Sequence, residues 1–193
     1  MVRLLQVCFY TTSFHLVNKM AKIVHKNNWF WVEKYNAMHE RKSRTYVRMC
    51  HINEGCTTIP IKDGKIVLER QYRYNLGKSF IELPGGGIEK KETSFLAAER
   101  EITEETGRTP KATRYLFRIG IAPEFSNSKI NYFSCNMGKK VRRNLDMTEQ
   151  ITPVSIPLSR ALSMIRSGKI NNNISLIGIL YYATFMQPEH KQR

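Results

Sequence analysis

The sequence predicts an α+β fold in which several strands surround one central helix and two further helices follow near the end of the chain. The segments WFWVEKY and RTYVRMCHI alternate aromatic or β-branched residues with polar ones, which is typical of strands. The central helix is expected over Ser94–Thr106, where apolar side chains recur at helical spacing and Gly107 follows as a stop signal. Two later helices are expected over 159–167, before a glycine, and over 173–186, which begins at an asparagine N-cap.

More strands are expected on both sides of the central helix. Residues 56–61 and 65–70 predict a hairpin around Asp63-Gly64, a dipeptide that favours tight turns. After the helix, RYLFRIGIAPEFSNSKINYFSCNM predicts two strands joined by a loop, and VSIP predicts a short last strand. The final helix is apolar on nearly every side, so we expect it to be buried in the core or against a partner chain.

The composition is that of a globular protein with a substantial core. Of 193 residues, 41% are hydrophobic and 24% are charged. We interpret the net charge of +15 as a basic surface that maintains solubility, while attraction of nucleotides or nucleic acid is the alternative. Four cysteines without CxxC or zinc spacing indicate a reducing compartment, and no run of 18 apolar residues exists to cross a membrane. We therefore expect a cytoplasmic protein.

The first residues carry no clear targeting signal. Residues 1–19 are mildly apolar, but polar residues interrupt them and no small-residue cleavage site follows, so a signal peptide is not expected. Met20 is a plausible alternative translation start.

Three carboxylates gather on one side of the central helix. At about 100° per residue, Glu104 and Glu105 lie within roughly 60° of Glu101. Like charges at this spacing repel, whereas helices gain stability from pairs of opposite sign. A solvated acidic helix is one interpretation. We favour the other, in which bound cations neutralise the carboxylates, because oxygen ligands suit hard ions such as Mg²⁺ or Mn²⁺.

The segment from Gly86 to Gly107 resembles the Nudix box, which reads Gly-x5-Glu-x7-Arg-Glu-hydrophobic-x-Glu-Glu-x-Gly. One departure is Arg108, where this family usually carries an aliphatic residue. The resemblance covers roughly residues 28–186, and it implies a mixed central sheet within an α/β/α sandwich and hydrolysis of a pyrophosphate bond. The matching residues are Gly86, Glu92, Arg100, Glu101, Ile102, Glu104, Glu105 and Gly107.

Segments beside the box resemble the ADP-ribose pyrophosphatase branch of the family. Upstream, Gln71-Tyr72-Arg73 precedes the run ELPGG, in which Gly85 stands where these enzymes usually have alanine. Downstream, Pro123 lies about fifteen residues past the box, a feature that goes with ADP-ribose substrates in this family. A single proline in a loop can equally serve only to form a turn. The inference of an ADP-ribose substrate therefore rests on Pro123 and the Gln71-Tyr72-Arg73 segment together.

The resemblance also implies the metal site. Glu101, Glu104, Glu105 and the carbonyl of Gly85 are expected to bind two or three Mg²⁺ ions, with Mn²⁺ as an alternative. Four other box residues are expected to be structural. Arg100 is expected to orient the glutamates, and Glu92 is expected to tie the loop to the helix. The other two structural residues are Gly86 and Gly107.

Further residues are expected to handle the substrate. Glu149, in the loop before the last strand, is the expected catalytic base, although in other branches a box glutamate such as Glu104 or Glu105 serves instead. Arg73 is expected to contact phosphate, because its planar guanidinium matches phosphate oxygens. Among the N-terminal aromatic residues, Trp29, Phe30 or Trp31 either stack on the adenine or fill an interface.

The chain is expected to divide into an unassigned extension (1–27), a strand subdomain (28–53) and a Nudix hydrolase domain (54–193). In the enzymes that it resembles, the N-terminal sheet is exchanged across a homodimer. The expected reaction converts ADP-ribose to AMP and ribose 5-phosphate. The alternatives are GDP-mannose or another nucleoside diphosphate sugar as substrate, and a non-catalytic protein that senses such a ligand. Binding or cleavage of RNA has only the net charge in its favour.

Overall fold

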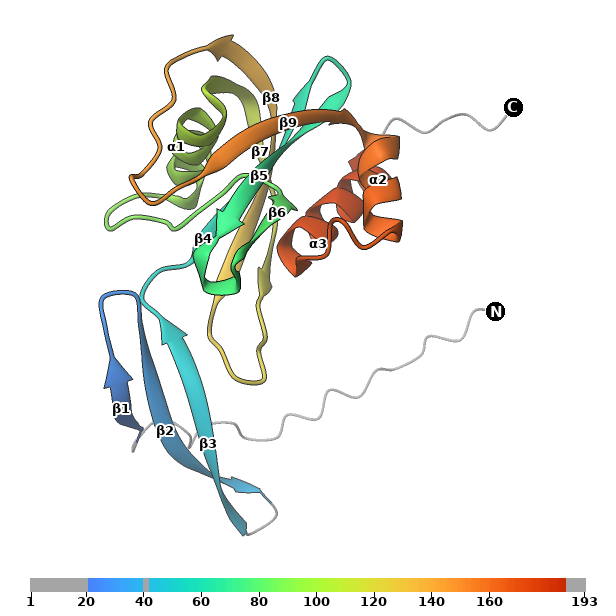
Figure 1. Ribbon diagram of the computed structural model, residues 1–193. Coiled ribbons are helices and arrows are strands. Elements are labelled where there is room, and N and C mark those ends of the chain that lie inside the picture. Colours follow the sequence, from blue (N-terminus) through green and yellow to red (C-terminus); the bar gives the residue numbers. More distant parts are fainter. Residues whose placement is uncertain (1–20, 40–41, 187–193) are drawn as a thin grey trace, which may run out of the picture. The chain divides into compact units, whose positions relative to one another are not determined.

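The computed structural model describes residues 21–39 and 42–186, which belong to two compact units (Figure 1). The first unit is Met1–Ile52 with Glu124–Asn127, and the second is Asn53–Pro123 with Ser128–Arg193. The expectations about a signal peptide and about Met20 as a start lie outside the described residues. In the described part, no helix is long and apolar enough to cross a membrane.

The first unit is an antiparallel sheet in the order β1-β2-β3. Its strands are Lys22–Lys26, Phe30–His39 and Lys42–His51. The prediction of β2 and β3 is confirmed, while β1 was missed because all five of its residues are exposed and show no apolar alternation. Residues 124–127 add to the edge of β3, where the Met49 N–H donates to the Phe125 carbonyl at 2.8 Å.

The second unit contains a mixed sheet in the order β6-β5-β4-β8-β7, with β9 paired to the other side of β5. Strands β4 and β8 are parallel, and the remaining pairs are antiparallel. The predicted turn at Asp63-Gly64 is confirmed, with positive φ angles of 49° and 71°. The strand bounds are β4 Gly55–Lys62, β5 Lys65–Arg73, β6 Lys78–Glu82, β7 Arg108–Gly120, β8 Lys129–Lys140 and β9 Ile151–Pro157.

Helices cover both faces of this sheet, which confirms the α/β/α sandwich (Figure 1). On one face lies α1 (Ser94–Thr106), which has the predicted bounds and ends at Gly107 as predicted. Thr93 caps its start, and Gly107 is in the left-handed conformation. The other face carries α2 (Leu158–Arg166) and α3 (Asn173–Tyr181), and a π-helical turn, η2 (Tyr182–Met186), continues α3. A short 3₁₀ turn, η1 (Tyr74–Leu76), links β5 to β6.

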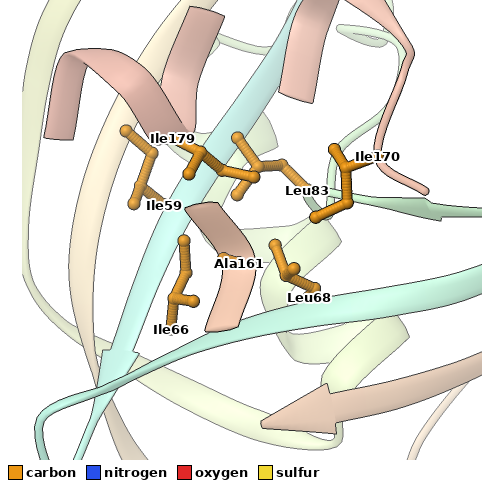
Figure 2. Packing of buried hydrophobic residues seen from close by; sticks show 7 residues of the cluster. All are labelled: Ile59, Ile66, Leu68, Leu83, Ala161, Ile170 and Ile179. Carbon is orange, nitrogen blue, oxygen red and sulfur yellow. The ribbon is translucent and has the colours of Figure 1, made fainter. Parts of the chain in front are cut away.

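Two buried clusters hold the helices to the sheet. The larger lies between the sheet and α2 and α3, and Figure 2 shows Ile66 and Leu68 of β5 packed with Ala161 and Ile179. The smaller lies under α1, where Ala97 and Ala98 meet Cys56 and Phe133. The alanines leave room for close approach of α1, and this approach decides where its carboxylates lie.

The last helix is less enclosed than its composition predicts. Ile179 is fully buried, but Leu180 is 44% exposed and Phe185 is 71% exposed. A helix that lies on the outside of a sheet buries only its inner side, whatever its composition. The same reasoning applies to α1, where Ile102 is fully buried and Phe95 is 41% exposed.

Candidate active site

Helix α1 points two of its glutamates into the protein. Because Ala97 and Ala98 pack against the sheet, Glu101 and Glu105, one and two turns further along, face inward as well. Glu105 is buried with 2% of its surface exposed, and Glu101 is buried with 9%. Glu104 lies at the rim, and 30% of its side chain is exposed.

Arg100 organises the carboxylates around it. Its guanidinium donates to both Glu92 oxygens at 3.0 Å, to Glu101 Oε1 at 2.9 Å and to Glu104 Oε2 at 3.0 Å. A further bond at 3.0 Å reaches the carbonyl oxygen of Gly87. One side chain thus joins the loop before α1 to the glutamates of the helix. Consistent with this, the hydrogen bonds from Arg100 hold the pKa of Glu92 below its usual range.

The loop of glycines lies directly against these carboxylates. The Gly85 N–H donates to Glu105 Oε2 at 2.9 Å. A Cβ on Gly86 would lie 2.3 Å from Glu101 Oε1, so only a glycine lets the backbone come so close. At Gly85 a Cβ would lie 2.2 Å from the Cys56 carbonyl oxygen. This backbone path therefore excludes the alanine that the resembling enzymes usually carry.

Strand β5 adds Glu69, which the sequence did not single out, beside Gln71 and Arg73, which it did. Glu69 and Gln71 are buried with 1% and 7% of their surfaces exposed, and Arg73 follows on the same side of the strand. Arg73 forms an ion pair with Glu82, which lies on the neighbouring strand β6. Glu82 is also the cross-strand partner of Glu69. One signal for Glu69 was available, namely a single acidic residue in the otherwise apolar run IVLE.

The inward-facing carboxyls resist ionisation. Burial raises the pKa of Glu101 to about 7, although the neighbouring Arg100 opposes this. Burial also raises the pKa of Glu105, and the charge of Glu69 adds to the effect. The pKa of Glu69 is raised by burial and then by the charge of Glu82. If all of these carboxyls were ionised, the site would hold more negative charge than its arginines neutralise, so a bound cation would favour their ionised forms.

A second arginine attaches the loop before β9 to helix α1. Arg143 donates from Nε to the Glu105 carbonyl at 2.8 Å and from Nη2 to the Ile151 carbonyl at 2.7 Å. Between these anchors, a turn is closed by the Glu149 N–H, which donates to the Asp146 carbonyl at 2.9 Å. The Asp146 N–H in turn donates to Glu149 Oε2 at 3.0 Å.

Glu149 lies at a small polar pocket. The pocket has a volume of about 310 Å³, and Glu149 forms part of its wall. Its charge also contributes to the raised pKa values of Glu101, Glu105 and Glu69, so it lies close to the α1 carboxylates. The pocket is lined by Arg70, Tyr72, Ser79, Leu145, Glu149, Gln150, Ile151 and Thr152.

Three further residues were expected at the site, and they are divided between the two units. Trp29 and Trp31 belong to the first unit, where Trp29 is 74% exposed and the Trp31 indole donates to Glu33 Oε2 at 3.3 Å. Pro123 is exposed in the turn between β7 and β8 and is the last residue of the segment Asn53–Pro123 of the second unit.

Within the described residues, no three His, Cys, Asp or Glu side chains already converge as a ligand set. Arg100 instead engages oxygens of Glu101 and Glu104, and the Gly85 N–H engages Glu105. The donors present still fit a hard divalent cation, because they are carboxylate oxygens and because Glu69 Oε2 is buried without a hydrogen-bond partner.

A family model described as NUDIX domain matches residues 55–141. The methanol dehydrogenase activator of Bacillus methanolicus is 31% identical over 131 residues, which cover 67% of this chain and 71% of that protein. An ADP-ribose pyrophosphatase of Bacillus subtilis (strain 168) is 28% identical over 121 residues, covering 62% of this chain and 65% of that protein. A crystal structure of ADP compounds hydrolase matches with a TM-score of 0.78 and 22% identity, over 86% of this chain and 91% of that one, so it shares the fold.

Proposed function

The chain belongs to the NUDIX family of hydrolases, and we propose that it hydrolyses the pyrophosphate bond of a nucleoside diphosphate sugar, with ADP-ribose as the preferred substrate. The products are AMP and ribose 5-phosphate. One observation carries the proposal. In the segment that matches the family, Glu101 and Glu105 are buried side by side with more negative charge than Arg100 balances. The similarity to an ADP-ribose pyrophosphatase supports the choice of substrate.

NUDIX enzymes generally need divalent metal ions, and this donor set suits Mg²⁺ or Mn²⁺. The ligands in this proposal are Glu101, Glu104, Glu105 and the carbonyl oxygen of Gly85. When bound, the cations neutralise the charge of the diphosphate and lower the pKa of bound water.

The remaining residues bind substrate and move a proton. Glu149 accepts the proton of the attacking water, and its position in the pocket wall near the α1 carboxylates supports this role. Arg73, with 46% of its side chain exposed, is available to phosphate oxygens while it pairs with Glu82. Pro123 and the aromatic pair Trp29 and Trp31 are proposed to contact the nucleoside.

The first unit is proposed to form a homodimer interface in a cytoplasmic protein. Its sheet exposes large apolar side chains, among them Trp29 at 74%, Met38 at 69% and Val47 at 55%. Such side chains are ordinarily covered when they occur together. If the aromatic side chains of this unit lie in a dimer interface, their presence is explained without a role in binding adenine.

Two alternatives share parts of this proposal. GDP-mannose or another nucleoside diphosphate sugar would be cleaved by the same carboxylates. A regulator that binds such a ligand is favoured by the similarity to a protein named methanol dehydrogenase activator. The three α1 glutamates favour hydrolysis, since a protein that only binds its ligand does not need to activate water.

A substrate panel distinguishes these possibilities. Purified protein is incubated with Mg²⁺ and with ADP-ribose, GDP-mannose or other nucleoside diphosphate sugars, and the released monophosphate is measured. We expect ADP-ribose to be cleaved fastest. If GDP-mannose is cleaved much faster, the inference from Pro123 is wrong, and if no compound is cleaved, the hydrolase proposal fails in favour of the regulator.

A further inference from the structure

Glu69 presents a buried carboxylate oxygen that no protein group satisfies. Only 1% of the residue is exposed, and Oε2 has no hydrogen-bond partner. The second buried side-chain oxygen of this kind in the described part of the chain, Gln71 Oε1, comes two residues later on the same side of β5. The Glu69 carboxyl makes a hydrogen bond with the carboxyl of Glu105, so Glu69 lies at the site beneath α1.

No arginine or lysine of the described residues forms an ion pair with Glu69 or with Glu105. The arginines nearby are engaged elsewhere, since Arg73 pairs with Glu82 and Arg100 pairs with glutamates of the loop and the helix. A carboxylate that is taken out of water without a counter-ion or donors is strongly destabilising. In the described part of the chain, the two carboxyls therefore form a pair without an arginine or lysine counter-ion, and their hydrogen bond and the Gly85 N–H oppose the repulsion that ionisation would bring.

The position of Glu69 does not itself require an acid. Its neighbours Val67 and Leu68 are buried and apolar, and an apolar side chain beside them would avoid the desolvation of a carboxyl group. Groups that lower stability in this way are concentrated at functional sites. A divalent cation would neutralise Glu69 and Glu105 together and would use the oxygen that otherwise has no partner.

We propose that Glu69 is a further ligand of the divalent cation, supplying a carboxylate oxygen from strand β5 to the ion that Glu105 binds from helix α1. The inference rests on the proposed function for the presence of that ion. It assigns part of the metal site to the sheet, outside the box, and it gives the unsatisfied oxygen of Glu69 a partner.

The test is Mn²⁺ binding by the full chain, measured by titration calorimetry without substrate, together with thermal unfolding in metal-free buffer. Glu69→Gln keeps the shape of the side chain and removes its charge. We expect Mn²⁺ to bind about 10-fold to 100-fold more weakly, the usual effect of a lost contact around a metal. Thermal unfolding in metal-free buffer checks that the variant is folded. The matched control, Glu89→Gln, changes an exposed glutamate of the box loop and should change neither quantity.

The outcomes separate this inference from the proposed function. If the unaltered protein does not bind Mn²⁺, the metal-dependent function fails. If it binds Mn²⁺ and Glu69→Gln binds equally well, Glu69 is not a ligand and the inference is overturned. Glu69→Met serves as a second variant, with the same expected loss of Mn²⁺ binding.

Discussion

The two faces of strand β5 differ in what they bury. Toward α2 and α3, Ile66 and Leu68 join an apolar cluster in which no charge is present (Figure 2). Toward α1, Glu69 and Gln71 are as deeply buried, yet each keeps an oxygen without a partner. Both faces belong to one strand of nine residues, so the backbone is the same and only the alternation of side chains separates them.

This difference shows where stability and function lie in the second unit. Burial of aliphatic side chains is favourable wherever it occurs, whereas burial of carboxyls is favourable only when something neutralises them. The apolar face therefore holds the fold together in any solution. The acidic face is held by the apolar face and the surrounding sheet, and in the proposed function a divalent cation neutralises it. Changes on the two faces should have opposite consequences.

The largest expected effect is on turnover, from changes to the acidic side. Glu105→Gln and Glu149→Gln should each lower turnover of the preferred substrate by at least about 100-fold, the scale of a lost acid–base role, while thermal unfolding shows a folded protein. Steady-state release of monophosphate provides the measurement, with Glu89→Gln as the control. Near-normal activity of Glu149→Gln would place the base on helix α1.

A change on the apolar face should act in the opposite way. Leu68→Ala is expected to lower the free energy of unfolding by about 2–5 kcal/mol, because it leaves a cavity between the sheet and α2. Turnover at a temperature where the variant is fully folded should be unchanged. Urea unfolding measures the first quantity. A large loss of turnover in the folded variant would show that the two faces are not independent.

A smaller effect is expected from pH in metal-free buffer. The pKa of Glu101 is about 7 in the folded protein and close to its usual 4.5 in the unfolded chain. Between these values the folded state binds more protons, so this group makes stability fall as pH rises from about 5 to 7. The melting temperature should fall over this range by roughly a few degrees. In Glu101→Gln the fall should be smaller, and an unchanged pH dependence would contradict the raised pKa.

Local patterns were sufficient for most of the fold. Helix α1 was predicted with its observed bounds because its apolar spacing and Gly107 both act within a few residues. The Asp63-Gly64 hairpin was predicted for the same reason. Strand β1 was missed because its exposed residues have no pattern, and the exposure of Leu180 was missed because burial depends on what lies on each side of a helix.

In the candidate site, too, some residues could be predicted from local sequence and others could not. The box glutamates lie close together in sequence, so their spacing on a helix was enough to predict one shared side. Glu69 is separated from Glu105 by 36 positions, which is the difference of the two residue numbers, and only the packing of α1 on the sheet brings them together. No local rule predicts such a pair.

The sequence by itself determined a carboxylate-bearing helix, the strands around it and the family resemblance, because all of these depend on neighbouring residues. Tertiary structure decided which carboxyls are buried, which of them Arg100 holds, that Arg143 ties the loop before β9 to the backbone of α1, and that Glu69 lies near Glu105. These outcomes depend on which surfaces exclude water together, and that is settled only when distant segments pack against one another.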